Sequence, residues 1–436
     1  MKELRDWKRT KDRKPLILRG ARQVGKTYIL LDFGKNYFPN YHYLNFEKDS
    51  QLNSIFEKNL SPTRIINELQ FYLDTSIDIK HDLLIFDEIQ HFPRVLTALK
   101  YFLEEMPELA LCSAGSLLGI SLAGDSFPVG KVTFLDLYPL NFDEFLEGIG
   151  KLRLTELLRT YNFQEPLPKI AHEQLWDLWK NYLIIGGLPE AVNIYREHLE
   201  NPYNAIKAVR NTQRDLLDTY MADIAKHSGK VNAQHIKRLW RNVPIQLAHT
   251  QDEGSQKFRF KDAVPKLRGY ERLSSPICWL ENARLILRTS IVNRAEIPLL
   301  SFSKENRFKQ YFLDVGLLTA VSNIDPKFII KYDYGNYKGY IAENFVAQEL
   351  SSVGIRELFC WEGRTSEIEF LLETQSGIIP IEVKAGKITK SKSLNIFEEH
   401  YHPKQSIVLS ARNVKISSSR LYAPIYSAGQ LIRLFV

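Results

Sequence analysis

The sequence is poor in cysteine and has no long apolar run. Its three cysteines, Cys112, Cys278 and Cys360, lie far apart and form no C-x-x-C pair, which argues against a disulfide framework and a cysteine zinc site. No apolar run approaches the roughly 18 residues that a membrane-spanning helix needs. The charged segment Met1–Lys8 lacks the apolar core of a signal peptide, and repeats and low-complexity tracts are lacking too. We therefore expect a cytoplasmic protein without a membrane partner.

The composition is that of a globular protein with more basic than acidic residues. Of 436 residues, 44% are hydrophobic and 25% are charged, and this length allows two to four domains. The formal net charge is +7, which mildly favours a polyanionic partner such as nucleic acid. Charge alone does not identify the partner, because many basic proteins bind no nucleic acid.

A phosphate-binding loop near the N-terminus is the most informative motif. It follows the apolar run Leu16–Leu18, precedes a segment that can open a helix, and reads Gly20, Ala21, Arg22, Gln23, Val24, Gly25, Lys26 and Thr27, with Tyr28 next. This order fits G-x-x-x-x-G-K-[ST] in a strand–loop–helix context. The glycines let backbone N–H groups face phosphate oxygens. We expect Lys26 to reach the β- and γ-phosphates of ATP and the Thr27 hydroxyl to ligate Mg²⁺.

Two carboxylates at the end of a second apolar run are the residues that we expect to hold Mg²⁺ and to activate water for ATP hydrolysis. The run Leu83–Phe86 is followed by Asp87 and Glu88. Asp87 fits the aspartate that holds Mg²⁺, and Glu88 fits the base that polarises the attacking water. Ser116 ends a further apolar segment and is the first candidate, before Ser113, for a side chain that senses the γ-phosphate. Helix capping by these serines is the alternative.

Residues 14–140 alternate short apolar runs with helical patterns, which indicates a parallel α/β sheet. Helices are expected at Pro62–Leu73 and Pro93–Glu105. The expected strands are Leu16–Arg19, Tyr41–Phe46, Leu83–Asp87, Leu109–Ala114 and Val132–Tyr138. The strand Tyr41–Phe46 lies between the two nucleotide motifs. An inserted strand, with a glutamate beside the aspartate, marks the additional-strand class of NTPases.

Together these residues resemble the AAA+ superfamily, and more narrowly the prokaryotic AAA+ ATPases that carry a C-terminal domain of unknown function. The resemblance covers almost the whole chain and rests on Gly20–Thr27, Leu84–Gln90, Gly115–Ser116, Tyr138–Phe145, Gly186–Glu190, Phe308–Leu318 and Ile381–Lys384. It implies a P-loop AAA+ ATPase core over residues 1–140 and a helical lid over 141–225. Lys131 stands where the family usually has arginine. Lysine keeps the positive charge but cannot form the paired hydrogen bonds of an arginine guanidinium.

Residues 226–330 predict a winged-helix-like domain, because two helices precede an expected hairpin. The elements are a helix from Asn232 to Leu247, a helix over Pro276–Ala283, and strands at Leu285–Val292 and Pro298–Phe302. Between Lys226 and Arg272 the sequence has eleven cations and four acids, an excess of seven. Such a module can bind DNA phosphates. The alternative is a packing or autoinhibitory module in which Phe258 and Phe260 point inward.

Residues 331–436 resemble the PD-(D/E)xK nuclease fold. The matching residues are Glu343 in an expected helix, Glu369 in a strand, and Glu382 and Lys384 at the end of the next strand. Glu382 and Lys384 are two apart in a strand and so point to the same face. The resemblance implies Mg²⁺ held by Glu343, Glu369 and Glu382, with Lys384 orienting a water or stabilising phosphorane charge. Glu369 replaces the more usual aspartate. The alternatives are therefore an active site, a weakened site, a relic that only binds nucleic acid, and charged residues that alternate outward on amphipathic strands.

The predicted fold class is α/β: a P-loop AAA+ parallel sheet with a helical lid, a winged-helix domain and a C-terminal α/β restriction-endonuclease-like domain. We expect the protein to bind and hydrolyse ATP with Mg²⁺ and so to control a module that acts on DNA or other nucleic acid. The alternatives are a regulatory switch that acts through a protein partner, with an inactive nuclease-like domain, and a ring-forming remodeller. The oligomeric state and the arginine finger, for which Arg210 and Arg214 are candidates, are left open.

Overall fold

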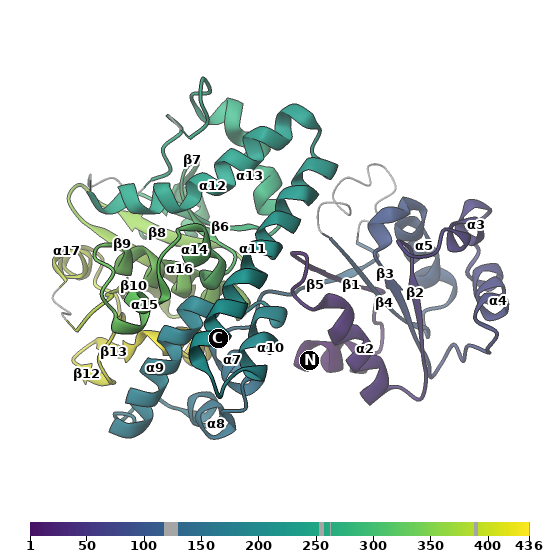
Figure 1. The fold of residues 1–436 in the computed structure, drawn as a ribbon, viewed down its shortest axis with the longest axis horizontal. Helices are drawn as coiled ribbons and strands as arrows, with labels where there is room; N and C mark the ends of the chain where they lie inside the picture. The colour runs from purple at the N-terminus through teal and green to yellow at the C-terminus, as the bar shows by residue number, and fades with distance from the viewer. Residues whose placement is uncertain (117–129, 253–256, 262, 388–390, 436) are drawn as a thin grey trace. The chain divides into compact units, whose positions relative to one another are not determined.

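The computed structural model describes residues 1–116, 130–252, 257–261, 263–387 and 391–435. The chain forms two compact units (Figure 1): residues 1–137 with 282–284, and residues 138–281 with 285–436. The first unit holds the nucleotide motifs, and its end lies close to the expected boundary after residue 140. The boundaries expected after residues 225 and 330 lie inside the second compact unit, and as domain boundaries they stay predictions.

The first unit is built on a fully parallel five-stranded sheet, as the alternating runs predict. The strands are β1 (Leu16–Gly20), β2 (Tyr41–Asn45), β3 (Leu83–Asp87), β4 (Ala110–Ser116) and β5 (Thr133–Asp136), in the order β2-β3-β4-β1-β5. The strand inserted between the two motif-bearing strands β1 and β3 is β4, whereas β2 lies at the edge. The assignment of Tyr41–Phe46 as the inserted strand is therefore wrong in space. Helical crossovers, not chain order, decide which parallel strands pair.

Helices cover both faces of this sheet. On one face, α1 (Lys2–Arg9) and α2 (Lys26–Tyr37) pack over Leu18. The other face packs Ile17 against α3 (Gln51–Glu57), α4 (Pro62–Leu73) and α5 (Pro93–Glu105), and a 3₁₀ turn η1 (Ile89–His91) follows β3. Neighbouring strand residues point to opposite faces, so a sheet covered on both sides needs continuous apolar strands. The polar side chains are left for the carboxyl ends of the strands, where ligands bind in such sheets.

The second unit combines a helical region with a mixed sheet (Figure 1). Its helices are α7 (Phe142–Gly148), α8 (Leu152–Thr160), α9 (Lys169–Ile185), α10 (Pro189–Glu197), α11 (Pro202–His227), α12 (Lys230–Asp252), α13 (Tyr270–Asn282), α14 (Val315–Val321), α15 (Pro326–Lys331), α16 (Tyr337–Ser352), α17 (Lys392–Tyr401) and α18 (Ala428–Leu431). Short 3₁₀ helices are η3 (Leu299–Phe302), η4 (Ile425–Ser427) and η5 (Ile432–Leu434). Across the described ranges, no helix combines the length and apolarity needed to cross a membrane.

One eight-stranded sheet runs through the expected winged-helix and C-terminal segments. Its order is β12-β13-β11-β10-β9-β8-β6-β7, and its strands are β6 (Ile286–Val292), β7 (Ser303–Phe312), β8 (Leu358–Glu362), β9 (Glu367–Thr374), β10 (Gly377–Val383), β11 (Ser406–Ser410), β12 (Lys415–Ser417) and β13 (Arg420–Pro424). Because β6 pairs with β8, the expected hairpin is part of this larger sheet and a free-standing winged helix is not confirmed.

The partner that the sequence suggests for β6 is wrong. The segment Pro298–Phe302 forms the 3₁₀ helix η3, and the strand that pairs with β6 is β7. The Leu299 N–H donates to a Glu373 carboxylate oxygen over 2.9 Å instead of joining a ladder. The apolar run there looks strand-like, but a short apolar run does not separate a strand from other buried backbone.

Three of the stretches that carry the family resemblance meet inside the second unit. The Leu140 N–H donates to the Gly187 carbonyl over 2.7 Å, and the Gly187 N–H donates to Asp314 over 2.6 Å. A Cβ on Gly187 would lie 1.9 Å from the Leu140 carbonyl oxygen, and one on Gly316 would lie 2.5 Å from the Gly186 nitrogen. Glycine is required at these positions because the backbones approach too closely for any side chain.

Candidate functional site

The phosphate-binding loop joins β1 to α2 with the backbone that the motif requires. Gly25 is the N-cap of α2 with a left-handed φ of 94°, and no side chain caps the helix. A Cβ on Gly20 would lie 2.4 Å from the Leu137 carbonyl oxygen. The first N–H groups of a helix have no intrahelical partner, and together with the helix dipole they favour an anion. The N-terminus of α2 has no side-chain cap, so its free N–H groups can bind a phosphate group.

Lys26 and Thr27 place a cation and a hydroxyl at this helix end. The buried Lys26 ammonium donates to the carbonyls of Ala21 over 2.8 Å and of Gly20 over 3.2 Å, so it is folded back over the loop. The Thr27 hydroxyl donates to Asp87 Oδ2 over 2.7 Å. The structure thus brings together the two residues that the sequence predicts as Mg²⁺ ligands. A hydroxyl beside a carboxylate is a donor set that suits a hard cation.

The other loop residues surround this pair. Ala21 and Val24 are buried, whereas Arg22 and Gln23 are not, and Gln23 has a left-handed φ of 62°. Tyr28 is 76% exposed, so its side chain points away from the loop interior. Its predicted place in the nucleotide site is therefore limited to the backbone of the first turn of α2.

Glu88 and Ser116 lie at the same strand ends. Glu88 follows β3 with a left-handed φ of 54°, and its carboxylate accepts a hydrogen bond from the Gln90 side-chain amide. A glutamate rarely adopts this backbone, and residues held in such conformations cluster at functional sites. Ser116 ends β4 in register with Gly20, but its side chain lies outside the described part of the structure, so its sensor role stays a prediction. Ser113 is buried further back in β4.

A tyrosine that the sequence pattern does not single out helps to hold the central carboxylate. The Tyr43 hydroxyl donates to Asp87 Oδ2 over 2.8 Å and accepts from the Asn45 side-chain amide over 3.0 Å. Burial raises the pKa of Tyr43 to about 12, so this hydroxyl stays a donor. No signal marks Tyr43 in the sequence, because tyrosine is common in strands. The parallel pairing of β2 and β3 places Asn45 opposite Asp87.

The second unit brings the nuclease-like residues into one buried cluster. Glu343 on α16, Glu369 on β9 and Glu382 on β10 are 9%, 8% and 1% exposed. The Glu382 carboxylate forms an ion pair with Lys384, and the Glu369 carboxylate accepts from the Val383 N–H over 3.1 Å. The expectation that these residues lie together agrees with this arrangement.

Two further residues, Lys309 and Tyr311 of β7, enter this cluster from the expected winged-helix segment. The Tyr311 hydroxyl donates to Glu343 Oε2 over 2.8 Å, and the Lys309 ammonium lies 3.5 Å from the same oxygen. Lys309 also pairs with Glu367. The sequence pattern does not mark Lys309 as a site residue, because it does not predict the strand β7 on which Lys309 lies.

The charges in this cluster are balanced by the protein itself. Burial, and then the neighbouring Glu382, hold the pKa of Glu369 well above its usual range. Burial opposes the charge on Lys384, but Glu369 and Glu382 outweigh it and raise the pKa of that lysine. In the described ranges, the ligand atoms of Glu343, Glu369 and Glu382 do not form a group within 4.8 Å of one another. A cation there would have to replace the contacts that Lys309 and Lys384 now make.

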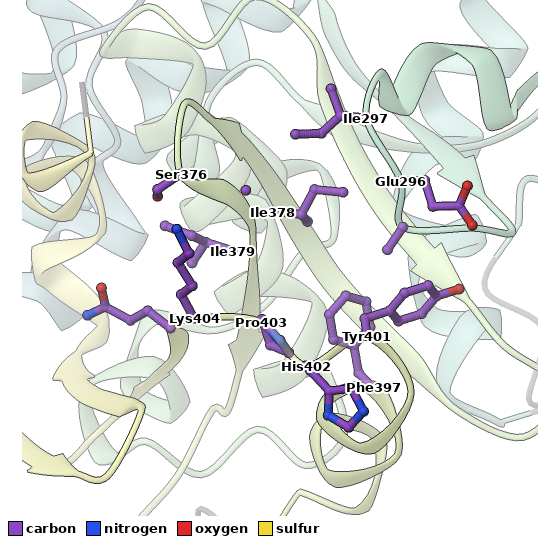
Figure 2. Close-up of a pocket in the computed structure, with 13 residues that line it drawn as sticks. Glu296, Ile297, Ser376, Ile378, Ile379, Phe397, Tyr401, His402, Pro403 and Lys404 are labelled. Carbon is purple, nitrogen blue, oxygen red and sulfur yellow. The ribbon is translucent and has the colours of Figure 1, made fainter.

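A cavity of about 640 Å³ lies elsewhere in the second unit (Figure 2). Its lining comes from the loop residues 295–297, the start of β10, the end of α17 and the loop after α17, and it includes Ile378, Phe397, Tyr401 and Lys404. The carboxylate cluster lies at the opposite end of β10, beyond Ile381. This cavity is therefore separate from the nuclease-like residues.

Comparison with known proteins gives three matches to family profiles. Residues 12–146 match the family described as "AAA domain". Residues 177–327 and 338–427 match two families described as domains of unknown function, DUF8612 and DUF4143. No protein of curated function matches the sequence.

The solved structures that match this chain share little sequence with it. A Walker-type ATPase of Pyrococcus abyssi is 14% identical with a TM-score of 0.45, over 74% of this chain and 95% of that one. The Drosophila ORC structure bound to DNA is 14% identical with a TM-score of 0.27, over 74% and 91%. The C. elegans PCH-2 structure is 11% identical with a TM-score of 0.26, over 45% and 60%.

The family match and the loop geometry agree for the first unit. Residues 12–146 match the AAA domain family, the five strands form a parallel sheet, and the loop Gly20–Thr27 and the acidic end of β3 meet at one edge of it.

Proposed function

We propose that the first unit binds and hydrolyses Mg²⁺-ATP. The contact between the Thr27 hydroxyl and the buried Asp87 carboxylate carries this proposal, because it joins the two motifs through side chains rather than through sequence spacing. Thr27 and Asp87 would hold Mg²⁺, and the bound ion would supply positive charge that offsets the negative charge developing during hydrolysis.

Each residue of the site has a distinct role in this proposal. The uncapped N–H groups from Gly25 onward bind phosphate oxygens, and Lys26 exchanges its bonds to loop carbonyls for bonds to phosphate. Glu88 accepts the proton of the attacking water as general base. Its backbone is left-handed, so the chain leaves the extended conformation of β3 at this residue.

The test uses two variants of the full chain. Lys26→Ala should abolish hydrolysis, and Glu88→Gln should retain ATP binding but stop turnover. Lys35→Ala, an exposed lysine near the end of the same helix, is the matched control and should leave turnover unchanged. Normal turnover by Lys26→Ala would overturn the assignment of the loop, and normal turnover by Glu88→Gln would remove Glu88 from the role of base.

We further propose that the second unit binds nucleic acid through its basic middle segment. The protein would then hydrolyse ATP while it is bound to nucleic acid. A groove of about 600 Å³ is lined by Lys257, Phe258, Arg259, Phe260, Lys261, Gly269, Lys304, Asn306 and Arg307, with no acidic residue among them. Lys257, Lys261 and Lys304 are exposed. Phosphate contacts of this kind give affinity without sequence preference.

The aromatic residues of this groove support a phosphate-binding role rather than base stacking. Phe258 is buried and stacks on Phe308 with ring centroids 5.5 Å apart, and Phe260 packs edge-on against Phe258. Their rings are occupied within the protein. The sequence-level alternative of inward-packed phenylalanines agrees with these contacts, and it leaves the exposed lysines as the groups that meet a polyanion.

Binding to labelled duplex DNA at several salt concentrations tests this proposal. Replacing Lys257, Lys261 and Lys304 by alanine should weaken binding and reduce the salt slope by about two to three units, since each phosphate contact contributes about 0.9. Replacing Lys151, Lys169 and Lys415, which are exposed on the same unit, is the matched control. Equal slopes for both triple variants, or no binding by the parent protein, would overturn it.

A second candidate activity is cleavage of phosphodiesters by the cluster of Glu343, Glu369, Glu382 and Lys384. The convergence of these four residues supports this activity. The ion pairs of Glu343 with Lys309 and of Glu382 with Lys384 oppose it, because they occupy carboxylates that a metal ion would need. Cleavage of plasmid and single-stranded DNA with Mg²⁺ or Mn²⁺, with and without ATP, is the test. Loss of cleavage in Glu382→Ala/Lys384→Ala, but not in the surface variant Glu357→Ala/Lys392→Ala, would establish it.

No cleavage by a protein that still hydrolyses ATP would favour the alternative function. In that case the second unit acts by binding, and the protein is a nucleotide-dependent switch whose partner is a protein or nucleic acid. Turnover that is indifferent to DNA would then favour a protein partner.

A further inference from the structure

A group of three ligand-type side chains lies beside the proposed general base. Glu47 follows β2, Glu88 follows β3, and His91 ends the 3₁₀ turn η1. Because β2 and β3 pair in parallel with Asn45 opposite Asp87, their carboxyl ends emerge together. One oxygen of each carboxylate and one imidazole nitrogen all lie within 4.8 Å of one another.

The histidine in this group has an unused nitrogen. His91 Nε2 is buried and has no hydrogen-bond partner among the described residues, and its distance to Glu47 Oε1 is 3.6 Å. That separation is too long for a hydrogen bond. It is close to the spacing of two ligand atoms on one zinc ion, since atoms about 2.1 Å from a tetrahedral metal lie about 3.4 Å apart.

We propose that Glu47, Glu88 and His91 form a binding site for a first-row transition-metal cation, with Zn²⁺ as the best-fitting ion. Imidazole together with carboxylates suits Zn²⁺, whereas Mg²⁺ prefers an all-oxygen site. The neighbouring Thr27 and Asp87 offer oxygen only. The two sites therefore select different ions although they lie at the same edge of the sheet.

Metal binding at this group inhibits hydrolysis, a consequence that rests on the proposed function of Glu88. A carboxylate that coordinates Zn²⁺ cannot take a proton from the attacking water. Lys26, Thr27 and Asp87 are outside the group, so ATP binding is retained while turnover stops. The site thus acts as a metal-sensitive brake on the ATPase.

The first measurement is direct Zn²⁺ binding to the nucleotide-free full chain, which does not depend on ATP turnover. The parent protein should bind one Zn²⁺ ion, and the dissociation constant should be at least tenfold higher in His91→Ala. His81→Ala is the matched control, because His81 of the same unit pairs with Asp78 at the surface and should leave this affinity unchanged. Equal Zn²⁺ affinity and stoichiometry in the parent and His91→Ala would overturn the site.

The second measurement is inhibition of ATP turnover by Zn²⁺ at constant Mg²⁺. The concentration for half-inhibition should rise at least tenfold in His91→Ala and in Glu47→Gln, each compared with its own zinc-free rate. Equal inhibition of the parent and both variants would overturn the brake. A parent protein that binds Zn²⁺ through His91 but never hydrolyses ATP would sink the proposed function and leave the metal site standing.

Discussion

At the scale of single residues, the nucleotide site depends on how one buried carboxylate is held. Asp87 is 2% exposed and accepts hydrogen bonds from the Thr27 and Tyr43 hydroxyls and from the Glu88 N–H. Hydrogen bonds to a charged acceptor are worth about 1.5–3 kcal/mol each, and they keep the carboxylate in one orientation. The site is thus oriented before any cation arrives.

Tyr43→Phe tests this orientation. The change removes one donor from Asp87 and keeps the packing of the ring. We expect the Mg²⁺ concentration for half-maximal turnover to rise about three- to tenfold, which corresponds to about 1 kcal/mol. A titration of ATP hydrolysis against Mg²⁺ measures it.

Tyr41→Phe is the control for this experiment, because Tyr41 lies on the same strand and is 39% exposed. It should leave the Mg²⁺ dependence unchanged. An unaltered Mg²⁺ dependence in Tyr43→Phe would show that the hydroxyl does not position Asp87.

At the scale of elements, the second unit is held by a close junction between α7, α10 and α14. Leu140 precedes α7, Gly187 precedes α10, and Asp314 is the N-cap of α14, whose side chain accepts from the Leu317 N–H over 2.9 Å. Arg210 of α11 joins this junction by donating to the Gly316 carbonyl over 3.2 Å. Its role as an arginine finger would require it to leave these bonds.

Gly187→Ala should destabilise the second unit by at least about 2 kcal/mol, because its Cβ would overlap backbone atoms that cannot rotate away. The Leu140 carbonyl oxygen would be only 1.9 Å from that Cβ. Urea unfolding of the full chain measures the loss. Gly386→Ala is the control, since a Cβ there meets no atom within 4 Å. Equal stability of the two variants would contradict the close junction.

Asp314 makes this junction sensitive to pH. Burial raises the pKa of Asp314 from 3.8 to about 6. Between these values the folded state binds more protons than the unfolded state, so this residue's contribution to the free energy of unfolding falls as pH rises from about 4 to about 6. From pH 4.5 to pH 7 the loss is about 2 kcal/mol.

Asp314→Asn should abolish this pH dependence and should also destabilise the fold by about 1–3 kcal/mol, because an amide offers one acceptor to two N–H donors. Urea unfolding at pH 4.5 and pH 7 measures both effects. The stability advantage of the parent over the variant should be larger at pH 4.5. If the difference in free energy of unfolding between the parent and Asp314→Asn is the same at both pH values, Asp314 is not the group that causes the pH dependence.

At the scale of the whole molecule, the division into two units does not follow the sequence segments. The helix α16 is buried at every residue from Tyr340 to Ser351, and β6 and β7 extend the sheet that it covers. The Phe312 N–H donates to the Asn344 side chain over 2.6 Å, and the Val315 N–H donates to the Gln348 side chain over 2.9 Å. The C-terminal segment therefore shares its core with residues that precede it.

A fragment of residues 331–436 should fail to unfold cooperatively, although a family profile matches 338–427 as a domain. It lacks β6 and β7, so Glu343 loses Tyr311 and Lys309 and stays buried without partners. A fragment of residues 138–436 keeps the whole sheet and should unfold in one transition. Circular dichroism with urea measures both, and a cooperative transition of the shorter fragment would contradict the shared core.

The sequence by itself determined the proposed nucleotide site to a large extent. The phosphate loop is local, so Gly20–Thr27 can be read from spacing, and β1 and β3 carry continuous apolar runs. Asp87 and Glu88 follow one such run directly. These features depend on neighbours in the chain, which the sequence states.

Only the tertiary structure decided what depends on distant neighbours. The place of β4 between β1 and β3, the bond from Tyr43 to Asp87, and the entry of Lys309 into the carboxylate cluster all follow from strand pairing. Spacing along the chain does not specify which strands pair, because crossovers and burial across elements select the partner. For the same reason, Glu47 meets Glu88 and His91 only in the folded chain.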